Sequence, residues 1–284
     1  MGVCINFALR PNNIFSQIIA FHLFAPRRIP KKYLPILQNQ CYNISMKLQK
    51  LLSLVRRCDA DFRLISSGDR IAVGLSGGKD SLALLYALAS YRRFSPHPFE
   101  LCAVVIDAGA GSDFSPLEPM CEELNVPLHI VRTQIAPIVF EERKEKNPCS
   151  LCAKMRRGAL DNKLNELGYN VLALGHNADD MVETFLLSLM YEGRLSTLQP
   201  KSYLDKSGIT LIRPLLYVRE KETAAFVKEN NVTVIHNPCP ANGFTQRETM
   251  KSVINNMCAV TPDAFERMHS ALCHPERNNL IIKN

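Results

Sequence analysis

The stretch "IAVGLSGGKDSLALLYAL", Ile71 to Leu88, constrains the fold more than any other part of this 284-residue chain. Its first part is a short run rich in apolar residues, as expected of a buried parallel strand. Its last part has apolar residues at a helical spacing from about Ser81 to Tyr91. Between them, Gly77 and Gly78 allow a tight turn. The stretch therefore predicts a strand, a glycine turn and a helix, the first unit of an α/β fold.

Strand-like and helix-like segments alternate along the rest of the chain. Strands are predicted at 70–76, 99–109, 127–133, 169–177 and 209–216, and further helices at 115–125, 150–167, 178–191 and 219–231. This alternation predicts a parallel sheet with helices on both faces, a Rossmann-like sandwich. Ligands of such folds bind beyond the carboxyl ends of the strands. The first glycine turn, Asp107 and Gly175–His176 all fall at that edge.

The loop S-G-G-K-D-S, Ser76 to Ser81, carries the groups needed to hold a polyphosphate. The start of a helix supplies N–H groups and a partial positive charge, Lys79 adds a full charge, and the two serine hydroxyls are further donors. It differs from the common P-loop, because Gly74 and Gly78 are one residue too close and Asp80 replaces Ser or Thr. A glycine turn without a ligand is the alternative, which the combined residues argue against.

A second segment, "LGHNADDMVETFL" from Leu174 to Leu186, places acidic residues behind another glycine. Asp179 and Asp180 fall in the first turn of a predicted helix, where carboxylates also complement the helix dipole. Glu183 follows on the same helical face. The helix dipole alone can explain acidic residues at these positions. They indicate ligand binding only in combination with the loop Ser76–Ser81.

The two segments together resemble the PP-loop family of ATP pyrophosphatases, whose motifs are S-G-G-K-D-S and G-H-x-x-D-D-x-x-E-T. The resemblance implies an adenine nucleotide α-hydrolase-like fold and cleavage of ATP between the α- and β-phosphates. It implies an adenylated substrate, with pyrophosphate left in the loop. Mg²⁺ would be held by Asp80, Asp180 and Glu183, hard oxygen ligands. The candidate nucleotide-binding residues are Ser76, Gly77, Gly78, Lys79, Asp80, Ser81, Asp107, Gly175 and His176.

Three of the ten cysteines stand in contexts that indicate chemistry. Cys149 and Cys152 form a C-x-x-C pair at the start of the predicted helix 150–167, where the dipole and nearby basic side chains are expected to lower the thiol pKa values. Such a pair fits a redox dithiol, half a zinc site or iron–sulfur ligation. No second C-x-x-C occurs in the sequence, so paired zinc motifs are excluded. Together with Cys239, the pair suggests three ligands on a cluster with one position left open.

All these features together resemble the TtcA family of tRNA 2-thiocytidine synthetases, over about Met46 to Asn255. The resemblance implies a 4Fe-4S cluster held by Cys149, Cys152 and Cys239, with ATP, Mg²⁺ and tRNA. Sulfur would replace O2 of the cytidine at tRNA position 32 after adenylation of that oxygen. Typical members of the family have a second cysteine where this chain has Asn242. The candidate catalytic residues are Lys79, Asp80, Asp180 and the three cysteines.

The same resemblance implies a sulfur donor, a cellular location and RNA contacts. Sulfur would come from a cysteine desulfurase or another sulfide donor in the cytoplasm, with no membrane involved, and a homodimer is one expected assembly. The candidate RNA contacts are Lys154, Arg156, Arg157 and Arg247. A solvated basic helix face is the alternative explanation for the first three.

Residues 1–45 are predicted to lie outside the enzyme domain, 46–255, which a helical tail follows at 256–284. They carry five basic and no acidic residues, and so supply most of the net charge of +7. RNA binding by the remainder must therefore rest on local clusters. An over-long gene model starting truly at Met46, a flexible extension and a targeting peptide remain open. The apolar stretch Phe15–Ala25 is too short to span a bilayer.

Other functions remain open at this point. Within the PP-loop group they are a thiouridine synthase, a sulfur-transfer enzyme acting on another base or a small molecule, and a tRNA-lysidine synthetase-like ligase. The ligase activity needs no cysteines, so the three thiols argue against it. A degenerate nucleotide-binding protein that senses iron or redox state is the non-enzymatic alternative. Intact Lys79, Asp80, Asp180 and Glu183 argue against it.

Overall fold

The computed structural model describes residues 34–144, 148–236, 238–239 and 246–279. A six-stranded sheet lies at its centre, in the order β3-β2-β1-β4-β6-β5. All neighbouring strands are parallel except β5 (Lys201–Leu204), which pairs antiparallel with β6 (Ile209–Ile212) at one edge. The other strands are β1 (Arg70–Gly74), β2 (Glu100–Asp107), β3 (Leu128–Arg132) and β4 (Val171–Ala173).

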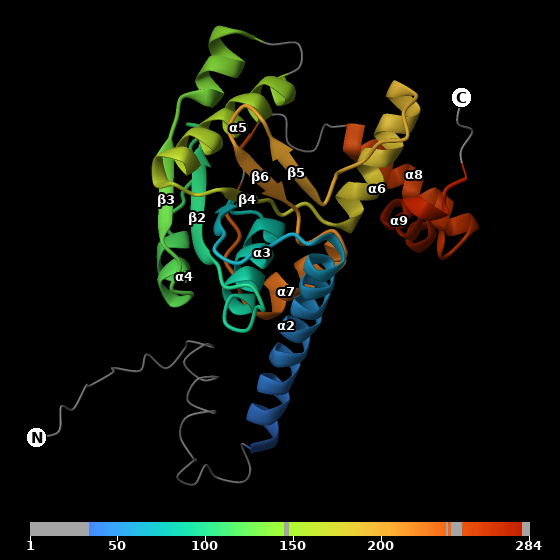
Figure 1. Ribbon diagram of the computed structural model, residues 1–284, viewed down its shortest axis with the longest axis horizontal. Coiled ribbons are helices and arrows are strands. Elements are labelled where there is room, and N and C mark those ends of the chain that lie inside the picture. The colour runs from blue at the N-terminus through green and yellow to red at the C-terminus, as the bar shows by residue number, and fades with distance from the viewer. Residues whose placement is uncertain (1–33, 145–147, 237, 240–245, 280–284) are drawn as a thin grey trace, which may run out of the picture.

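Helices cover both faces of the sheet (Figure 1), and alternate strand residues pack into different hydrophobic clusters. On one face, Ile71 and Val73 of β1 belong to the main hydrophobic core. On the other face, Ala72 packs in a second cluster with Leu164. The first layer contains α2 (Leu34–Phe62), α3 (Lys79–Tyr91), α4 (Leu117–Glu123) and α7 (Glu220–Glu229), and the second contains α5 (Pro148–Leu167). This period of two confirms the predicted Rossmann-like α/β sandwich.

A third group of helices packs together at the right of Figure 1. It contains α6 (Ala178–Leu187), α8 (Gln246–Val260) and α9 (Ala264–Cys273), joined by a cluster that includes Val182, Met250 and Phe265. The remaining short helices are η1 (Pro137–Glu142), η2 (Ser188–Glu192) and η3 (Pro275–Arg277). Because α8 contributes Arg247 and Lys251, this group brings cations to the carboxyl edge of the sheet.

The differences from the predicted elements have simple physical reasons. All five predicted strands are present but shorter, and β5 is additional. Sequence reasoning missed β5 because its residues alternate between exposed and half-buried positions and form no apolar run. The helix predicted at 178–191 ends at Leu187 and continues as the π-helical η2.

The N-terminal boundary falls within a helix. The continuous helix α2 begins at Leu34, before the predicted boundary at residue 46. The three-part division of the chain therefore remains a prediction, and the stretch Phe15–Ala25 lies outside the described residues. None of the helices that the structure describes is both long and apolar enough to cross a bilayer.

Candidate functional site

The glycine turn after β1 has a shape that only glycine allows. Gly77 has a φ of +79°, in the left-handed region. A Cβ on Gly77 would lie 2.5 Å from the Cβ of Ile235, which is closer than packed atoms approach. The backbone N–H of Ile235 also donates to the carbonyl of Gly77 at 2.9 Å. The segment that contains Ile235 therefore fixes the loop from outside.

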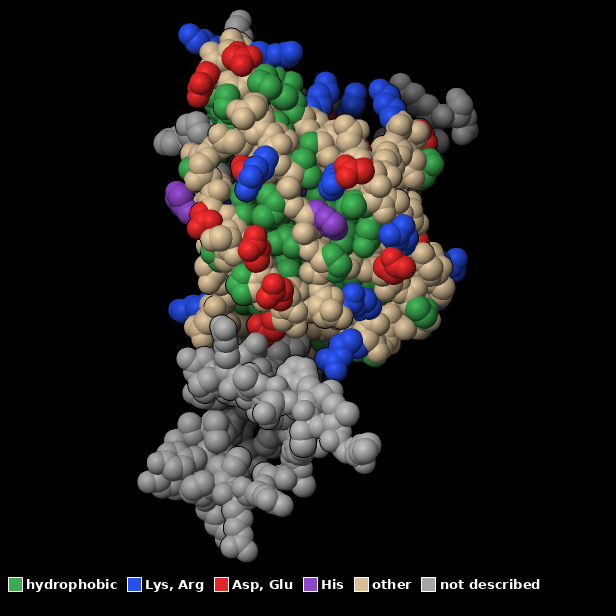
Figure 2. Space-filling view, turned by 90° about the vertical axis from the view of Figure 1, so that its left-hand side faces the viewer, with side chains coloured by type: hydrophobic (Ala, Val, Ile, Leu, Met, Phe, Trp, Pro, Cys, Tyr) green, Lys and Arg blue, Asp and Glu red, His purple; other side chains and the backbone are tan. Residues whose placement is uncertain are grey.

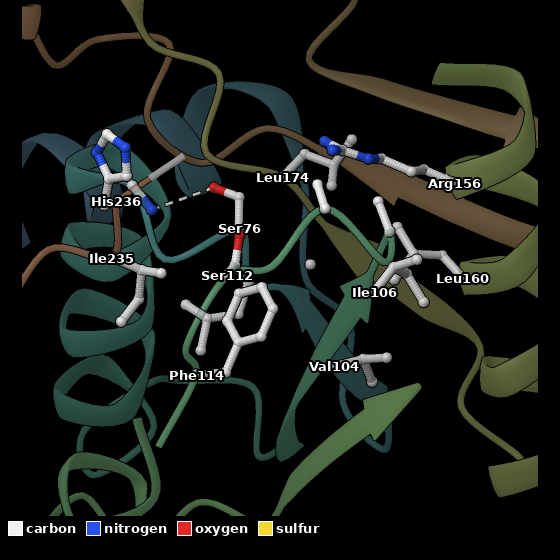
Figure 3. A pocket seen from close by; sticks show the side chains of 15 residues that line it. Ser76, Val104, Ile106, Ser112, Phe114, Arg156, Leu160, Leu174, Ile235 and His236 are labelled. Atoms are coloured by element: carbon white, nitrogen blue, oxygen red, sulfur yellow. Dashed lines mark hydrogen bonds between the residues drawn. The ribbon is translucent and has the colours of Figure 1, made fainter. Parts of the chain in front are cut away.

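Hydroxyl groups fix the same loop from inside. The Ser81 hydroxyl donates to the carbonyl of Gly78 at 2.9 Å and lies 3.1 Å from the hydroxyl of Ser76. Figure 3 shows the Ser76 hydroxyl at the wall of a pocket, accepting from the N–H of Gly78 at 3.3 Å. No side chain caps the start of α3. Its first N–H groups are therefore suited to an anionic ligand.

Lys79 and Asp80 connect this loop to other elements. The ammonium of Lys79 lies 2.9 Å from Asp80 Oδ2 and 2.8 Å from Glu220 Oε1. Burial lowers the pKa of Lys79, but the hydrogen bonds with Glu220 and Asp80 outweigh it and raise the pKa above its ordinary value. Asp80 Oδ1 accepts from Asn177 Nδ2 at 3.1 Å and from the hydroxyl of Thr223. The starts of α3, α6 and α7 therefore meet at one carboxylate.

The second acidic segment stands directly beside this junction. A Cβ on Gly175 would lie 2.9 Å from the backbone N of Ser81, so a glycine is needed where β4 leaves the sheet. Asn177 and Asp180 cap α6 reciprocally, each accepting from the other's backbone N–H at 3.0 Å. The guanidinium of Arg247 pairs with Asp180. Both predicted motifs therefore meet at the carboxyl edge.

Glu183 is a buried carboxylate, with 3% of its surface exposed. Its Oε2 lies 3.8 Å from the guanidinium of Arg247. Burial first, and then the neighbouring Asp180, raise the pKa of Glu183 to about 7. Among the described residues, no three carboxylate, imidazole or thiol side chains are placed to hold one metal ion. The magnesium roles of Asp80, Asp180 and Glu183 therefore stay predictions.

His176 and Asp107 bound the site on its two sides. The Nδ1 atom of His176 accepts from Nε of Arg213 at 3.2 Å. Burial first, and then Arg213, lower the pKa of His176 to about 3, so the ring is neutral. Asp107 Oδ1 accepts from the N–H of Gly109 at 2.9 Å and shapes the loop after β2. It is the neighbouring Ala108, not Asp107, that lines the pocket.

The pocket has a volume of about 250 Å³ and lies beside the glycine loop (Figure 3). Its apolar wall suits a flat nucleobase. Arg156 reaches toward it from α5, and its Nε atom is buried without a hydrogen-bond partner among the described residues. The apolar side chains of the wall include Val104, Ile106, Phe114, Leu160, Leu174 and Ile235. Arg156, predicted as an RNA contact, therefore borders this pocket.

The three candidate thiols share one neighbourhood. Cys149 is exposed, whereas Cys152 and Cys239 are half-buried. Burial raises the pKa of Cys152, and the charges of Cys239 and Cys149 raise it further, while Arg156 opposes them. The prediction of a lowered pKa was therefore wrong for Cys152, because burial outweighs the nearby cation. Asn242 lies outside the described residues.

The other predicted RNA contacts lie in different settings. Lys154 is exposed on α5, and Arg157 is half-buried one turn along. Arg247 is engaged by Asp180 and Glu183 instead of pointing to a free surface. Its RNA role remains a prediction.

Sequence reasoning missed several residues of the site. Asn177 had a usable signal, because Asn before two acidic residues is a typical helix N-cap. Arg213, Glu220 and Thr223 had none. Arg213 directly follows β6 and the other two belong to α7, and all three reach the site only through the order of the strands and helices.

Comparisons with known proteins identify relatives of this chain. Residues 43–257 match the PP-loop domain model. The tRNA-cytidine(32) 2-sulfurtransferase of Geobacter sulfurreducens is 40% identical over 241 residues, covering 84% of this chain and 94% of the relative. The enzyme of the same name from Syntrophotalea carbinolica is 36% identical over 252 residues, covering 87% and 95%.

A solved structure shares the fold. The U34-tRNA thiolase NcsA from Methanococcus maripaludis, described with its 4Fe-4S cluster, matches with a TM-score of 0.66 and 23% identity. The match covers 83% of this chain and 81% of that one.

Substitution of Gly77 tests the loop. We expect Gly77→Ala to raise the Kd for ATP at least ~10-fold, because Ile235 and the loop must separate. Gly208→Ala is the matched control, since Gly208 also has a positive φ, of 72°, but a Cβ there meets its nearest atom at 3.8 Å. Isothermal titration with ATP measures both, and equal affinities for the two variants would contradict the assignment.

The buried Glu183 predicts a pH-dependent stability. Because its pKa is raised from 4.5 to about 7, the folded protein binds an extra proton in this window, and the free energy of unfolding falls as the pH rises through it. Without Mg²⁺, we expect Glu183→Gln to be more stable than wild type by about 2 kcal/mol near pH 8 and equally stable near pH 4. Urea denaturation at both pH values measures this, and an equal difference at both contradicts it.

Proposed function

This chain belongs to the PP-loop domain family and, within it, to the family of tRNA-cytidine(32) 2-sulfurtransferases; from that premise we propose that it is an ATP-dependent tRNA sulfurtransferase. One observation carries the proposal. Arg156 and Ala108 line the pocket, and Cys152 of α5 packs against the cluster that contains Ala108, so the pocket adjoins the candidate thiols. Activation by ATP and delivery of sulfur can then occur at one substrate carbon.

The first step joins the target base to AMP. The carbonyl oxygen of the base, O2 of cytidine 32, attacks the α-phosphorus of ATP, and the bond to the β-phosphate breaks. Pyrophosphate leaves into the loop, where Lys79 and the N–H groups at the start of α3 stabilise its charge. The pKa of Lys79 is raised, so its ammonium group stays charged in this role. Asp80, Asp180 and Glu183 would hold Mg²⁺ on the polyphosphate.

The second step replaces oxygen by sulfur. A sulfur nucleophile attacks the activated carbon, the carbon–oxygen bond breaks, and AMP leaves with the original carbonyl oxygen. The apolar pocket wall restricts water, which would otherwise hydrolyse the adenylated base. Sulfide is the co-reactant; where a cysteine desulfurase is the donor, a thiol reductant must release its persulfide sulfur as sulfide.

Three cysteine thiolates are a suitable ligand set for an iron–sulfur cluster. Cys149, Cys152 and Cys239 would hold a 4Fe-4S cluster, whose ligands sit on separate iron atoms and need not converge on one ion. The arrangement supports the fit, because Cys149 and Cys152 lie one turn apart at the start of α5 and the half-buried Cys239 is close enough to act on Cys152. When bound with three protein ligands, such a cluster supplies an iron position open to sulfur.

The expected substrate agrees with the distribution of charge. Several lysine and arginine side chains lie along the upper rim of the face in Figure 2, with acidic side chains at its left and right ends. A basic rim favours an RNA backbone without dependence on sequence. We infer the cytoplasm as the location because the proposed substrate is tRNA, and a homodimer remains a prediction.

Replacement of Cys239 tests the cluster and the reaction together. After anaerobic purification and reconstitution, we expect about four iron atoms per wild-type chain, with absorption at ~400 nm. Cys239→Ala loses most of both and, in a strain lacking the gene, fails to restore 2-thiocytidine in tRNA. The control Cys258→Ala removes another half-buried thiol and behaves as wild type.

Two results would contradict these assignments. Wild-type protein without iron-linked absorption contradicts the cluster. Unchanged 2-thiocytidine in the tRNA of the deletion strain, measured by mass spectrometry of nucleosides, contradicts the substrate and leaves the ATP chemistry standing. A thiouridine lost in its place identifies the alternative base.

A further inference from the structure

Arg213 is a buried cation with neutral partners. It follows β6 at the carboxyl edge of the sheet and is 8% exposed. Its Nε donates to Nδ1 of His176 at 3.2 Å, and a terminal nitrogen donates to the carbonyl of Gln199. Burial first, and then the charge of Arg157, lower its pKa to about 10, and no described carboxylate acts in the opposite direction. A buried charge without a counter-ion is costly, which indicates a missing anion.

A second arginine adds to this charge. Arg157 is half-buried on α5 and acts through space on both Arg213 and His176. Its charge also reaches Asp161, one turn further along α5, but no ion pair or hydrogen bond of Arg157 is found within the described ranges. Arg247 is different, because Asp180 and Glu183 compensate it. Arg213 therefore has no hydrogen-bonded carboxylate among the described residues, whereas Asp161 partly offsets the charge of Arg157.

The sheet order separates this charge from the nucleotide groups. The polyphosphate loop follows β1. The apolar pocket beside it is lined mainly from β1, β2 and the loop after β2, with Leu174 after β4 at its border. Arg213 follows β6, which lies beyond β4 on the other side of β1. The polyphosphate already has Lys79 and the N–H groups of α3. An anion at Arg213 therefore comes from a second substrate.

The helix α5 carries both Arg157 and two of the candidate cluster cysteines. Cys152 and Arg157 are five residues apart on α5, and Arg156 between them borders the nucleotide pocket. A substrate held at Arg157 and Arg213 would thus have its reacting nucleoside within reach of both the pocket and the thiols. The fork of an arginine matches the two free oxygens of a phosphodiester.

We propose that Arg213 and Arg157 bind a phosphodiester group of the RNA substrate next to the nucleoside that is modified. The inference rests on the proposed function and adds the contact that positions the RNA. His176 accepts at Nδ1 and therefore carries its proton at Nε2, and it holds the Arg213 guanidinium in place. The contact is independent of base identity and sets the register of the RNA in the site.

Binding measurements on the full-length protein test this site. The probe is an in vitro transcribed tRNA with cytidine at position 32, titrated at several salt concentrations. We expect Arg157→Gln to raise the Kd about 10-fold and to lower the slope of log Kd against log salt by about 0.9. Arg213→Lys keeps the charge but loses the fork, so we expect an increase of ~3-fold or more.

The controls separate RNA binding from nucleotide binding and from folding. Lys206→Gln removes one exposed charge in the β5–β6 turn, at the opposite edge of the sheet, and should leave the Kd for tRNA within about twofold. The Kd values for ATP and pyrophosphate should stay within about twofold in all variants. If Arg213→Lys fails to fold, Arg157→Gln decides, because its half-buried side chain makes no hydrogen bond with described residues.

Three results overturn the proposal. Unchanged tRNA affinity in Arg157→Gln, with wild-type protein binding tRNA normally, overturns this site alone and leaves the proposed function intact. If Arg157→Gln instead loses affinity for ATP or pyrophosphate, the anion bound at this site belongs to the nucleotide and not to the RNA. Wild-type protein that binds no tRNA at all overturns the proposed function as well.

Discussion

The close approach of two chain turns is the contact on which the rest of the site depends. The backbone at Gly175 lies against the start of α3, where a Cβ would come within 2.9 Å of the Ser81 nitrogen. This contact places the segment after β4 beside the loop after β1, so Asp80 reaches both Asn177 and Thr223. Side chains from three helices then share one carboxylate. Parallel neighbouring strands make this possible, because their carboxyl ends meet at one edge.

The charges at this edge are balanced internally in the ligand-free protein. Lys79 is shared by two carboxylates, and Arg247 is held by Asp180 beside the buried Glu183. A nucleotide with its cation can exchange these pairs for phosphate and Mg²⁺ without leaving a charge unpaired. Arg213, on the far side of β4, has no carboxylate hydrogen-bonded to it among the described residues. The charges of the nucleotide site are therefore balanced without a ligand, whereas Arg213 gains a counter-ion only when the second substrate binds.

Site residues could be predicted from the sequence where they lie in one continuous motif, but not where tertiary packing brings them together. Ser76–Ser81 and Gly175–Glu183 could be predicted because each motif occupies one continuous strand–turn–helix unit. Arg213 and Thr223 could not, because only the order of the strands and helices brings them to the site. The strand β5 was missed for lack of an apolar run. The pKa of Cys152 was predicted with the wrong sign, since the helix dipole is visible in a sequence and burial is not.

The central claim is that the base oxygen becomes part of AMP. A tRNA that carries ¹⁸O at the C2 carbonyl of cytidine 32 tests it directly, with reconstituted enzyme, ATP, Mg²⁺ and sulfide. Mass spectrometry of the products should find the ¹⁸O in the phosphate of AMP, in an amount equal to the 2-thiocytidine formed. Release of ¹⁸O into water, or AMP formed without sulfur in the tRNA, would contradict adenylation of the base as the step that this site performs.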